Sequence, residues 1–189
     1  MAKRRYFDDI NAGPSVLTSH PRFCELATES FYLDCTDDFS PFGSDDGADT
    51  LSSLEDWYRD GGRDAEVDDF LGDLMAEWEI EIPDLADASH AVVAAWLDED
   101  PAHEVHLHTL CRAYVATAFG QLKITGAIWP TILREALESL ECQLWLNERA
   151  QTRNPSWPHA EEQRIKLKKM EALLNGLKPE GHHSPDGQK

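Results

Sequence analysis

Five acidic residues have the type and spacing to bind a positively charged partner. Glu66, Asp69 and Asp73 recur at intervals of three and four residues, which places their carboxylates on one face of a predicted helix. Asp45 and Asp46 stand in a loop earlier in the chain. A dense group of exposed carboxylates speeds association with a basic partner and makes that association sensitive to salt. The sequence therefore predicts an acidic binding face made of these five residues.

The segment from Asp34 to Asp49 holds six Asp residues among 16. Clustered carboxylate oxygens can chelate a hard cation such as Ca²⁺. The EF-hand pattern is absent, because with Gly47 in its glycine position the first and last ligands would be Phe42 and Ser53. The alternative is that these Asp side chains form turns and cap a helix that follows Asp49. We favour turns and capping, and predict no metal ligand here.

Four residues of types that bind zinc lie close together in the chain: His103, His106, His108 and Cys111. In a helix His103 and His106 share a face, whereas His108 points to a nearly opposite side. The string HEVH at 103–106 also differs from the HExxH zinc motif, because its second His comes one position early. We therefore interpret the cluster as the polar first turn of an otherwise apolar helix.

Motifs for nucleophilic catalysis and nucleotide binding are absent, since the chain has no GxSxG, GxxxxGK[ST] or GxGxxG string. Acid–base sites can be assembled from residues far apart in sequence, so this absence does not exclude an enzyme. Adjacent acids such as Asp45 and Asp46 are expected without any role in so acidic a segment. The sequence favours a protein that is not an enzyme, and predicts no catalytic residue and no cofactor.

The negative charge is concentrated in one part of the chain. The 189 residues include 17 Lys and Arg against 36 Asp and Glu, a net charge of -19. Between Asp34 and Glu104 there are 23 acidic residues and two basic ones, a net charge of -21, and the remainder carries +2. A charge this negative repels nucleic acid and anionic membranes. We therefore expect a basic protein as the partner, with no direct nucleic acid and no membrane.

Helical periodicity dominates the elements that must position these residues. The two strongest patterns, 102–125 and 130–150, are joined by a short link around Gly126 and predict an antiparallel helix hairpin. A further helix is predicted over 158–175. The alternation at 80–82 is compatible with one short strand. The predicted class is all-α or nearly so, in a compact multi-helix arrangement.

The acidic segment also carries regularly spaced apolar residues, which argues that it folds. One amphipathic stripe consists of Val67, Phe70, Leu71, Leu74 and Trp78. We expect one helical domain over 1–180, with an acidic part at 34–104 and a helical part at 105–177, followed by a disordered tail at 181–189. Ile165 is expected on the inward face of the last helix.

The compartment is predicted from what the chain does not contain. Asp8 and Asp9 stand where the hydrophobic region of a signal peptide would be, and no stretch approaches the ~18 apolar residues of a transmembrane helix. The four cysteines are widely separated and form no CxxC pair, which is typical of reduced thiols in the cytosol. We expect a cytoplasmic protein.

Two short runs have the look of family signatures. The run FSPFGSDDGADTL at 39–51, followed by Trp57, resembles the YfeS-like group of uncharacterised bacterial proteins. The second run is AFGQLKITG at 118–126. The resemblance implies a bacterial, cytosolic protein and brings no known reaction, so no catalytic residue is carried over from it.

Three functions are left open by these patterns. The leading hypothesis is protein binding through the acidic face, as an immunity-like or antitoxin-like inhibitor or a mimic of nucleic acid. The alternative is a metal-dependent, hydrolase-like helical protein that uses the Asp-rich loop with His103 or His106. The third is an accessory helical domain without a specific ligand, whose charge serves solubility.

Overall fold

The computed structural model describes residues 4–9, 12–83 and 88–177. Within these ranges the regular structure is helical, with no strand and one isolated bridge between Asp9 and Gly13. The all-α prediction is confirmed. The α-helices are α1 (Pro21–Leu26), α2 (Asp45–Arg59), α3 (Val67–Glu77), α4 (His90–Glu99), α5 (Pro101–Thr125), α6 (Pro130–Arg153) and α7 (Ala160–Asn175). Short 3-10 helices lie at Val16–Thr18, Ser30–Leu33 and Asp64–Glu66.

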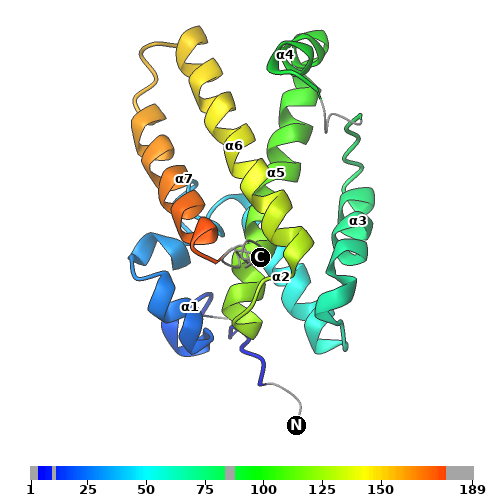
Figure 1. Cartoon of the computed structure of the whole chain (residues 1–189), viewed down its shortest axis with the longest axis vertical. Coiled ribbons are helices and arrows are strands. Elements are labelled where there is room, and N and C mark those ends of the chain that lie inside the picture. The colour runs from blue at the N-terminus through cyan, green and yellow to red at the C-terminus, as the bar shows by residue number, and fades with distance from the viewer. Residues whose placement is uncertain (1–3, 10–11, 84–87, 178–189) are drawn as a thin grey trace, which may run out of the picture.

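The predicted helix hairpin is formed by α5 and α6, which lie side by side in Figure 1. Gly126 ends α5 in the left-handed conformation at φ 76°, and its N–H donates to the Leu122 carbonyl at 3.0 Å. Only glycine adopts this conformation without a steric cost. The conformation of the Gly126 backbone therefore explains why α5 ends here, as the sequence predicts. The last helix, α7, packs along the other side of α6.

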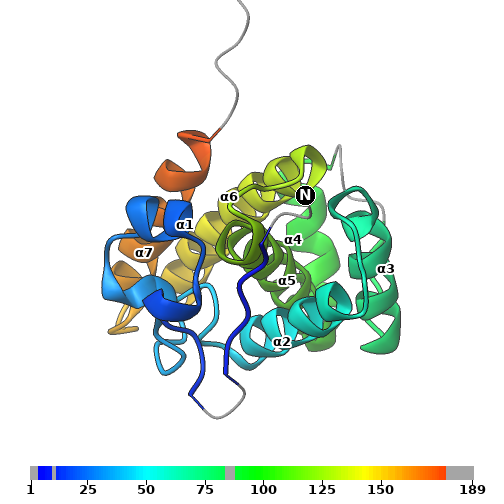
Figure 2. The same ribbon diagram turned by 90° about the horizontal axis from the view of Figure 1, so that it is seen from below.

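Helix α5 lies at the centre of the molecule, surrounded by other helices (Figures 1 and 2). It contacts α6 and α2 most extensively, and also α4, α1 and α3. Every residue from Val115 to Ile124 is buried. Three of its polar side chains, Thr117, Gln121 and Lys123, are fully buried. Gln121 and Lys123 have partners within the protein, whereas the Thr117 hydroxyl has no hydrogen-bond partner among the described residues.

The acidic segment shares a hydrophobic core with the C-terminal helices. Leu51 and Leu54 of α2 and Leu71 of α3 belong to the same cluster of buried residues as Phe119 of α5 and Leu140 of α6. The amphipathic stripe of α3 therefore faces α5 and α6, as its spacing indicates. The disordered tail predicted at 181–189 lies outside the described residues.

Helix α2 begins earlier than predicted. Asp49 was expected to cap it, but the N-cap is Ser44, whose side chain accepts a hydrogen bond from the Gly47 N–H at 3.2 Å. Asp45 and Asp46 then occupy the first turn, where carboxylates interact favourably with the positive end of the helix dipole. These two residues therefore lie in a helix and not in a loop.

Two further expectations are wrong. No strand forms at 80–82, because the chain turns back just after α3: Glu79 has φ 55°, and the Ile80 N–H donates to the Met75 carbonyl at 3.0 Å. The Ile80 N–H and the Met75 carbonyl are therefore used in closing the end of α3 and not in pairing with a strand. Ile165 is 43% exposed, because the buried face of α7 consists of Ala160, Leu167, Met170 and Leu174.

The irregular N-terminal segment closes the C-terminal end of α5. The Tyr6 N–H donates to the Ile124 carbonyl at 3.1 Å, and the His20 N–H donates to the Lys123 carbonyl at 2.7 Å. These carbonyls are among the last four of the helix, which have no partner within it. The segment thus completes the hydrogen bonding of the central helix.

Candidate functional site

Three of the five predicted acidic residues line one groove between α2 and α3. Glu66 comes from the 3-10 turn before α3, and Asp69 and Asp73 come from the outer face of α3 itself. Glu77 extends the same row by one more turn. We call this depression of about 420 Å³ the acidic groove; it is lined by Ser53, Trp57, Glu66, Asp69, Phe70, Asp73, Leu74 and Glu77.

Aromatic side chains form part of the acidic groove. Trp57 of α2 lies against Phe70 of α3, with ring centroids 5.1 Å apart. Gly62 makes room for the indole, because a Cβ atom at this position would lie 2.3 Å from the Trp57 ring. A half-buried aromatic face beside carboxylates favours a ligand that is both cationic and partly apolar.

The carboxylates of the acidic groove differ in whether the protein neutralises them. Glu66 forms an exposed ion pair with Arg63. Asp69, Asp73 and Glu77 have no basic partner among the described residues. Three like charges spaced one helical turn apart repel one another, so a cation between them is favoured.

Asp45 and Asp46 lie away from the acidic groove, in a separate cavity. Asp46 forms an ion pair with Arg112 of α5 at 2.9 Å and accepts a hydrogen bond from the Thr109 hydroxyl at 3.2 Å. Asp45 is exposed beside it. The five predicted residues thus form two sites, and Asp46 is engaged within the protein.

The three histidines of the predicted cluster lie in three different environments. His103 stacks on Trp96 with ring centroids 4.3 Å apart, and His106 contacts the backbone of Glu81. The Nδ1 atom of His108 is buried without a hydrogen-bond partner among the described residues. Burial and, secondarily, the Arg112 guanidinium lower the pKa of His108, so its imidazole is neutral near pH 7.

The described residues contain no group of three or more His, Cys, Asp or Glu side chains that could hold a metal ion. Asp34 and Asp37 of the Asp-rich segment close turns by accepting the N–H groups of Thr36 and Phe39, at 2.8 and 3.1 Å. The favoured interpretation of these two acids as turn-forming residues is confirmed. The neighbouring Cys142 thiol, together with burial, raises the pKa of the Cys111 thiol.

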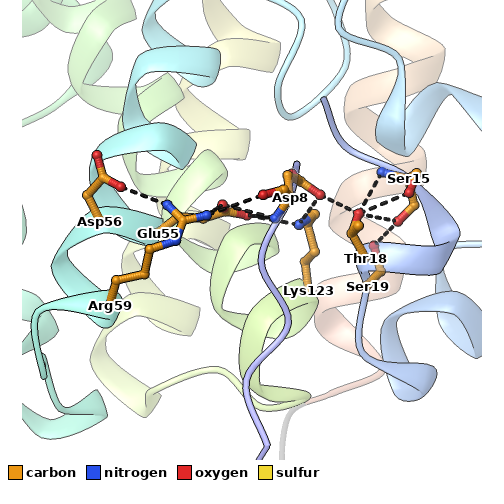
Figure 3. Close-up of polar contacts among 8 residues, drawn as sticks. All are labelled: Asp8, Ser15, Thr18, Ser19, Glu55, Asp56, Arg59 and Lys123. Atoms are coloured by element: carbon orange, nitrogen blue, oxygen red, sulfur yellow. Dashed lines mark hydrogen bonds and ion pairs between the residues drawn. The ribbon is translucent and has the colours of Figure 1, made fainter. Parts of the chain in front are cut away.

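A buried charge network at the centre of the fold was not predicted. Lys123 is fully buried, and its Nζ atom lies 2.8 Å from Asp8 Oδ1 and 3.1 Å from Glu55 Oε1 (Figure 3). The Asp8 N–H donates to both oxygens of Glu55, at 3.0 and 3.1 Å. Arg59 binds Glu55 Oε2 at 2.8 Å, and Thr18 donates to Asp8. Each oxygen of Glu55 is therefore satisfied within the protein.

The buried network holds the N-terminal segment against α2 and α5. Next to it, Gln121 donates to the Tyr58 hydroxyl at 2.9 Å and accepts from the Trp129 N–H at 2.9 Å. The Tyr58 hydroxyl donates to Asp64 at 2.8 Å, and burial raises the pKa of Tyr58. Gln121 and Lys123 both come from the run at 118–126, so the signature look of that run was the available signal for this network.

Comparison with known proteins gives one curated relative. The chain is 36% identical over 138 residues to the "Uncharacterized protein YfeS" of Escherichia coli (strain K12). The resemblance to the YfeS-like proteins is confirmed. The match covers 72% of this YfeS-like chain and 55% of that relative, so the chain spans about half the length of the curated protein.

No family model matches this YfeS-like chain, and no solved structure matches it. In the part of the chain that the structure describes, none of the helices has the length and apolar character needed to cross a membrane.

Proposed function

We propose that this YfeS-like protein binds a basic segment of a partner protein in the acidic groove. The observation that carries the proposal is the row of Asp69, Asp73 and Glu77 beside Trp57, with no basic side chain of the described residues paired to the row. The proposal extends the acidic-face hypothesis with Glu77 and Trp57, and it leaves out Asp45 and Asp46, which do not line the acidic groove.

The carboxylates of the acidic groove favour association with a basic partner and lower the stability of the free protein. Three unpaired carboxylates on one helix face repel one another, and a partner with Lys or Arg side chains removes this repulsion when it binds. Solvent-exposed pairs contribute little affinity individually. The apolar surface of Trp57 and Phe70 is therefore needed to supply hydrophobic burial and cation–π contact.

The spacing of the carboxylates indicates the form of the partner segment. Asp69, Asp73 and Glu77 follow one another at four-residue intervals, about 6 Å along the axis of α3. A partner helix with Lys or Arg at the same interval would match all three charges. An immunity-like or antitoxin-like inhibitor, or a mimic of nucleic acid, acts in this way, since each covers a basic surface of its target.

A defined basic peptide tests the proposal. The probe is a helical peptide with Lys at every fourth position and Leu between them, and the readout is the NMR signal of the Trp57 indole N–H, assigned with Trp57→Phe. We expect saturable binding that weakens as salt is added. The triple variant E66Q/D69N/D73N should weaken binding about tenfold or more at low ionic strength.

The matched control changes the net charge equally at other places. E25Q/D49N/E141Q replaces three exposed acids, none of which lines the acidic groove. We expect it to alter the affinity less than about twofold. If both triple variants weakened the peptide equally, the overall charge and not the groove would be responsible, and the proposal would be wrong.

A further inference from the structure

Two of the four cysteines come together across the helix hairpin of α5 and α6. Cys111 of α5 lies 15 positions before Gly126, and Cys142 of α6 lies 16 positions after it. Both helices rise about 1.5 Å per residue and run in opposite directions from the turn, so the two residues reach the same level of the hairpin. The fold thus brings together two thiols that are 31 positions apart in sequence.

The two thiols also lie on the facing sides of their helices. Cys111 follows Leu107 by one helical turn on α5, and Cys142 precedes Leu146 by one turn on α6. All four residues belong to one small hydrophobic cluster that is separate from the main core. Each thiol shifts the pKa of the other, as neighbouring titratable groups do. Cys111 and Cys142 therefore form a pair.

The environments of the two thiols give each of them a different role. Cys111 is 3% exposed, whereas Cys142 is only half-buried and can be reached by small solutes. The Cys111 thiol lowers the pKa of Cys142, and the Cys142 thiol together with burial raises the pKa of Cys111. Cys142 is therefore the first of the pair to form a thiolate, which is the form that reacts with an oxidant. An accessible thiolate beside a second thiol is typical of redox-sensing cysteines.

The other two cysteines lie outside this cluster. Cys24 packs against the main core, and Cys35 is exposed after the 3-10 helix at Ser30–Leu33. Partial burial and the charge of Asp8 raise the pKa of Cys35, which lowers its thiolate fraction. Cys35 is thus an accessible thiol outside the pair, and it provides an internal control for oxidation.

We propose that a hydroperoxide converts Cys111 and Cys142 into a disulfide that links α5 to α6. The Cys142 thiolate attacks one peroxide oxygen and is oxidised to a sulfenic acid, while the O–O bond breaks and the other oxygen leaves as water or an alcohol with the proton that Cys142 released. The Cys111 sulfur then attacks the sulfenic sulfur. The S–S bond forms, the S–O bond breaks, and water leaves with the Cys111 proton.

The two steps balance, because two thiols and one hydrogen peroxide give one disulfide and two waters. Cys142 is the peroxide-reactive residue, and Cys111 is the residue that resolves the sulfenic acid. Neither cysteine lines the acidic groove, so this modification site is separate from the protein-binding function proposed above.

Oxidation of the full chain tests the proposal. Reduced protein is treated with equimolar hydrogen peroxide and followed by intact mass, free-thiol titration and peptide mapping without reductant. We expect two of the four thiols to be lost, with a mass decrease of about 2 Da, no added oxygen and full reversal by dithiothreitol. The linked peptides should contain Cys111 and Cys142. Cys35 should react at least about fivefold more slowly than the pair.

Substitutions separate the two roles. Cys111→Ala keeps a small apolar side chain in the cluster and should leave the sulfenic acid on Cys142, where dimedone traps it. Cys142→Ala should leave the buried Cys111 reduced. The matched control Cys35→Ser removes an exposed thiol, and it should form the disulfide at the wild-type rate within about twofold. Thermal unfolding shows that each variant is folded.

Three results would overturn the proposal. The first is the absence of a link between Cys111 and Cys142 in the folded protein, or its formation only in urea. The second is a folded Cys111→Ala variant whose Cys142 gives no dimedone adduct. The third is a disulfide between two chains through Cys35 in place of the internal link, seen as a dimer on a gel without reductant.

Discussion

Asp and Glu side chains have opposite roles in the acidic groove and in the buried network. In the buried network Glu55 is 4% exposed, and its oxygens meet Lys123, Arg59 and a backbone N–H. In the acidic groove Asp69 and Asp73 are exposed and have no basic partner among the described residues. A buried carboxylate must be satisfied by the protein, whereas an exposed one is solvated and stays available to a partner. Burial, and not residue type, therefore separates the acids that hold the fold from those that can bind.

The strongest test of this contrast is to remove the cation of the buried network. Lys123→Met should lower the free energy of unfolding by about 3–5 kcal/mol, because it leaves the largely buried Asp8 carboxylate without its cation and leaves Glu55 with Arg59 as its remaining cation. Urea denaturation measures the loss. Lys168→Met, which breaks only an exposed pair with Glu171, should cost less than about 1 kcal/mol. A loss of similar size in both variants would contradict the contrast.

A second test acts on the wall of the acidic groove. Gly62→Ala should destabilise the protein by about 1–3 kcal/mol and shift the Trp57 indole signal, because the new methyl group would overlap the ring. The matched control is Gly72→Ala on the exposed side of α3, where a Cβ meets nothing within 4 Å. Since Ala favours a helix over Gly, this control should stabilise by about 0.5–1 kcal/mol. Thermal unfolding of both variants would show the opposite signs.

His108 is a titratable group that belongs to neither of these two regions. The pKa of His108 is lowered in the folded state, mainly by burial, while the unfolded value is about 6.5. As the pH falls below about 6.5 the unfolded chain binds a proton that the folded protein resists, so stability is lost until the folded pKa is reached. The slope is at most about 1.4 kcal/mol per pH unit for one proton. Urea unfolding at several pH values should show a shallower loss for His108→Gln; an identical slope would contradict this assignment.

The smallest expected effect concerns the acids of the groove themselves. Asp73→Asn should change the free energy of unfolding by no more than about 0.5 kcal/mol, in the stabilising direction, because it removes repulsion from Asp69 and Glu77. The same variant should weaken the basic peptide. A large loss of stability on this substitution would mean that Asp73 serves the fold, as Glu55 does.

Helix positions followed from local patterns with few errors. The hairpin, its stop at Gly126 and the stripe of α3 were all predicted, because each depends on residues near one another in the chain. The start of α2 was misplaced, since both Ser44 and Asp49 are good cap residues and local sequence does not choose between them. Ile165 was placed inside because its side chain is apolar, yet the packing of α7 on α6 leaves it exposed.

The acidic binding face was predicted in part. Glu66, Asp69 and Asp73 were grouped correctly by helical periodicity, which is a property of the chain itself. Asp46 was assigned to the same face, but its ion pair joins it to Arg112, 66 residues later in sequence. No local pattern reports a contact over that separation.

The sequence by itself determined the helical class, the central hairpin and the concentration of negative charge in one segment, because periodicity and composition are local quantities. The tertiary structure alone decided which carboxylates are buried and which are exposed. Lys123 would be taken for an ordinary exposed residue near the end of a helix, until the N-terminal segment brings Asp8 to it from 115 positions away. Burial depends on every element that packs around a residue, so the distinction between structural and binding acids arises only when the chain has folded.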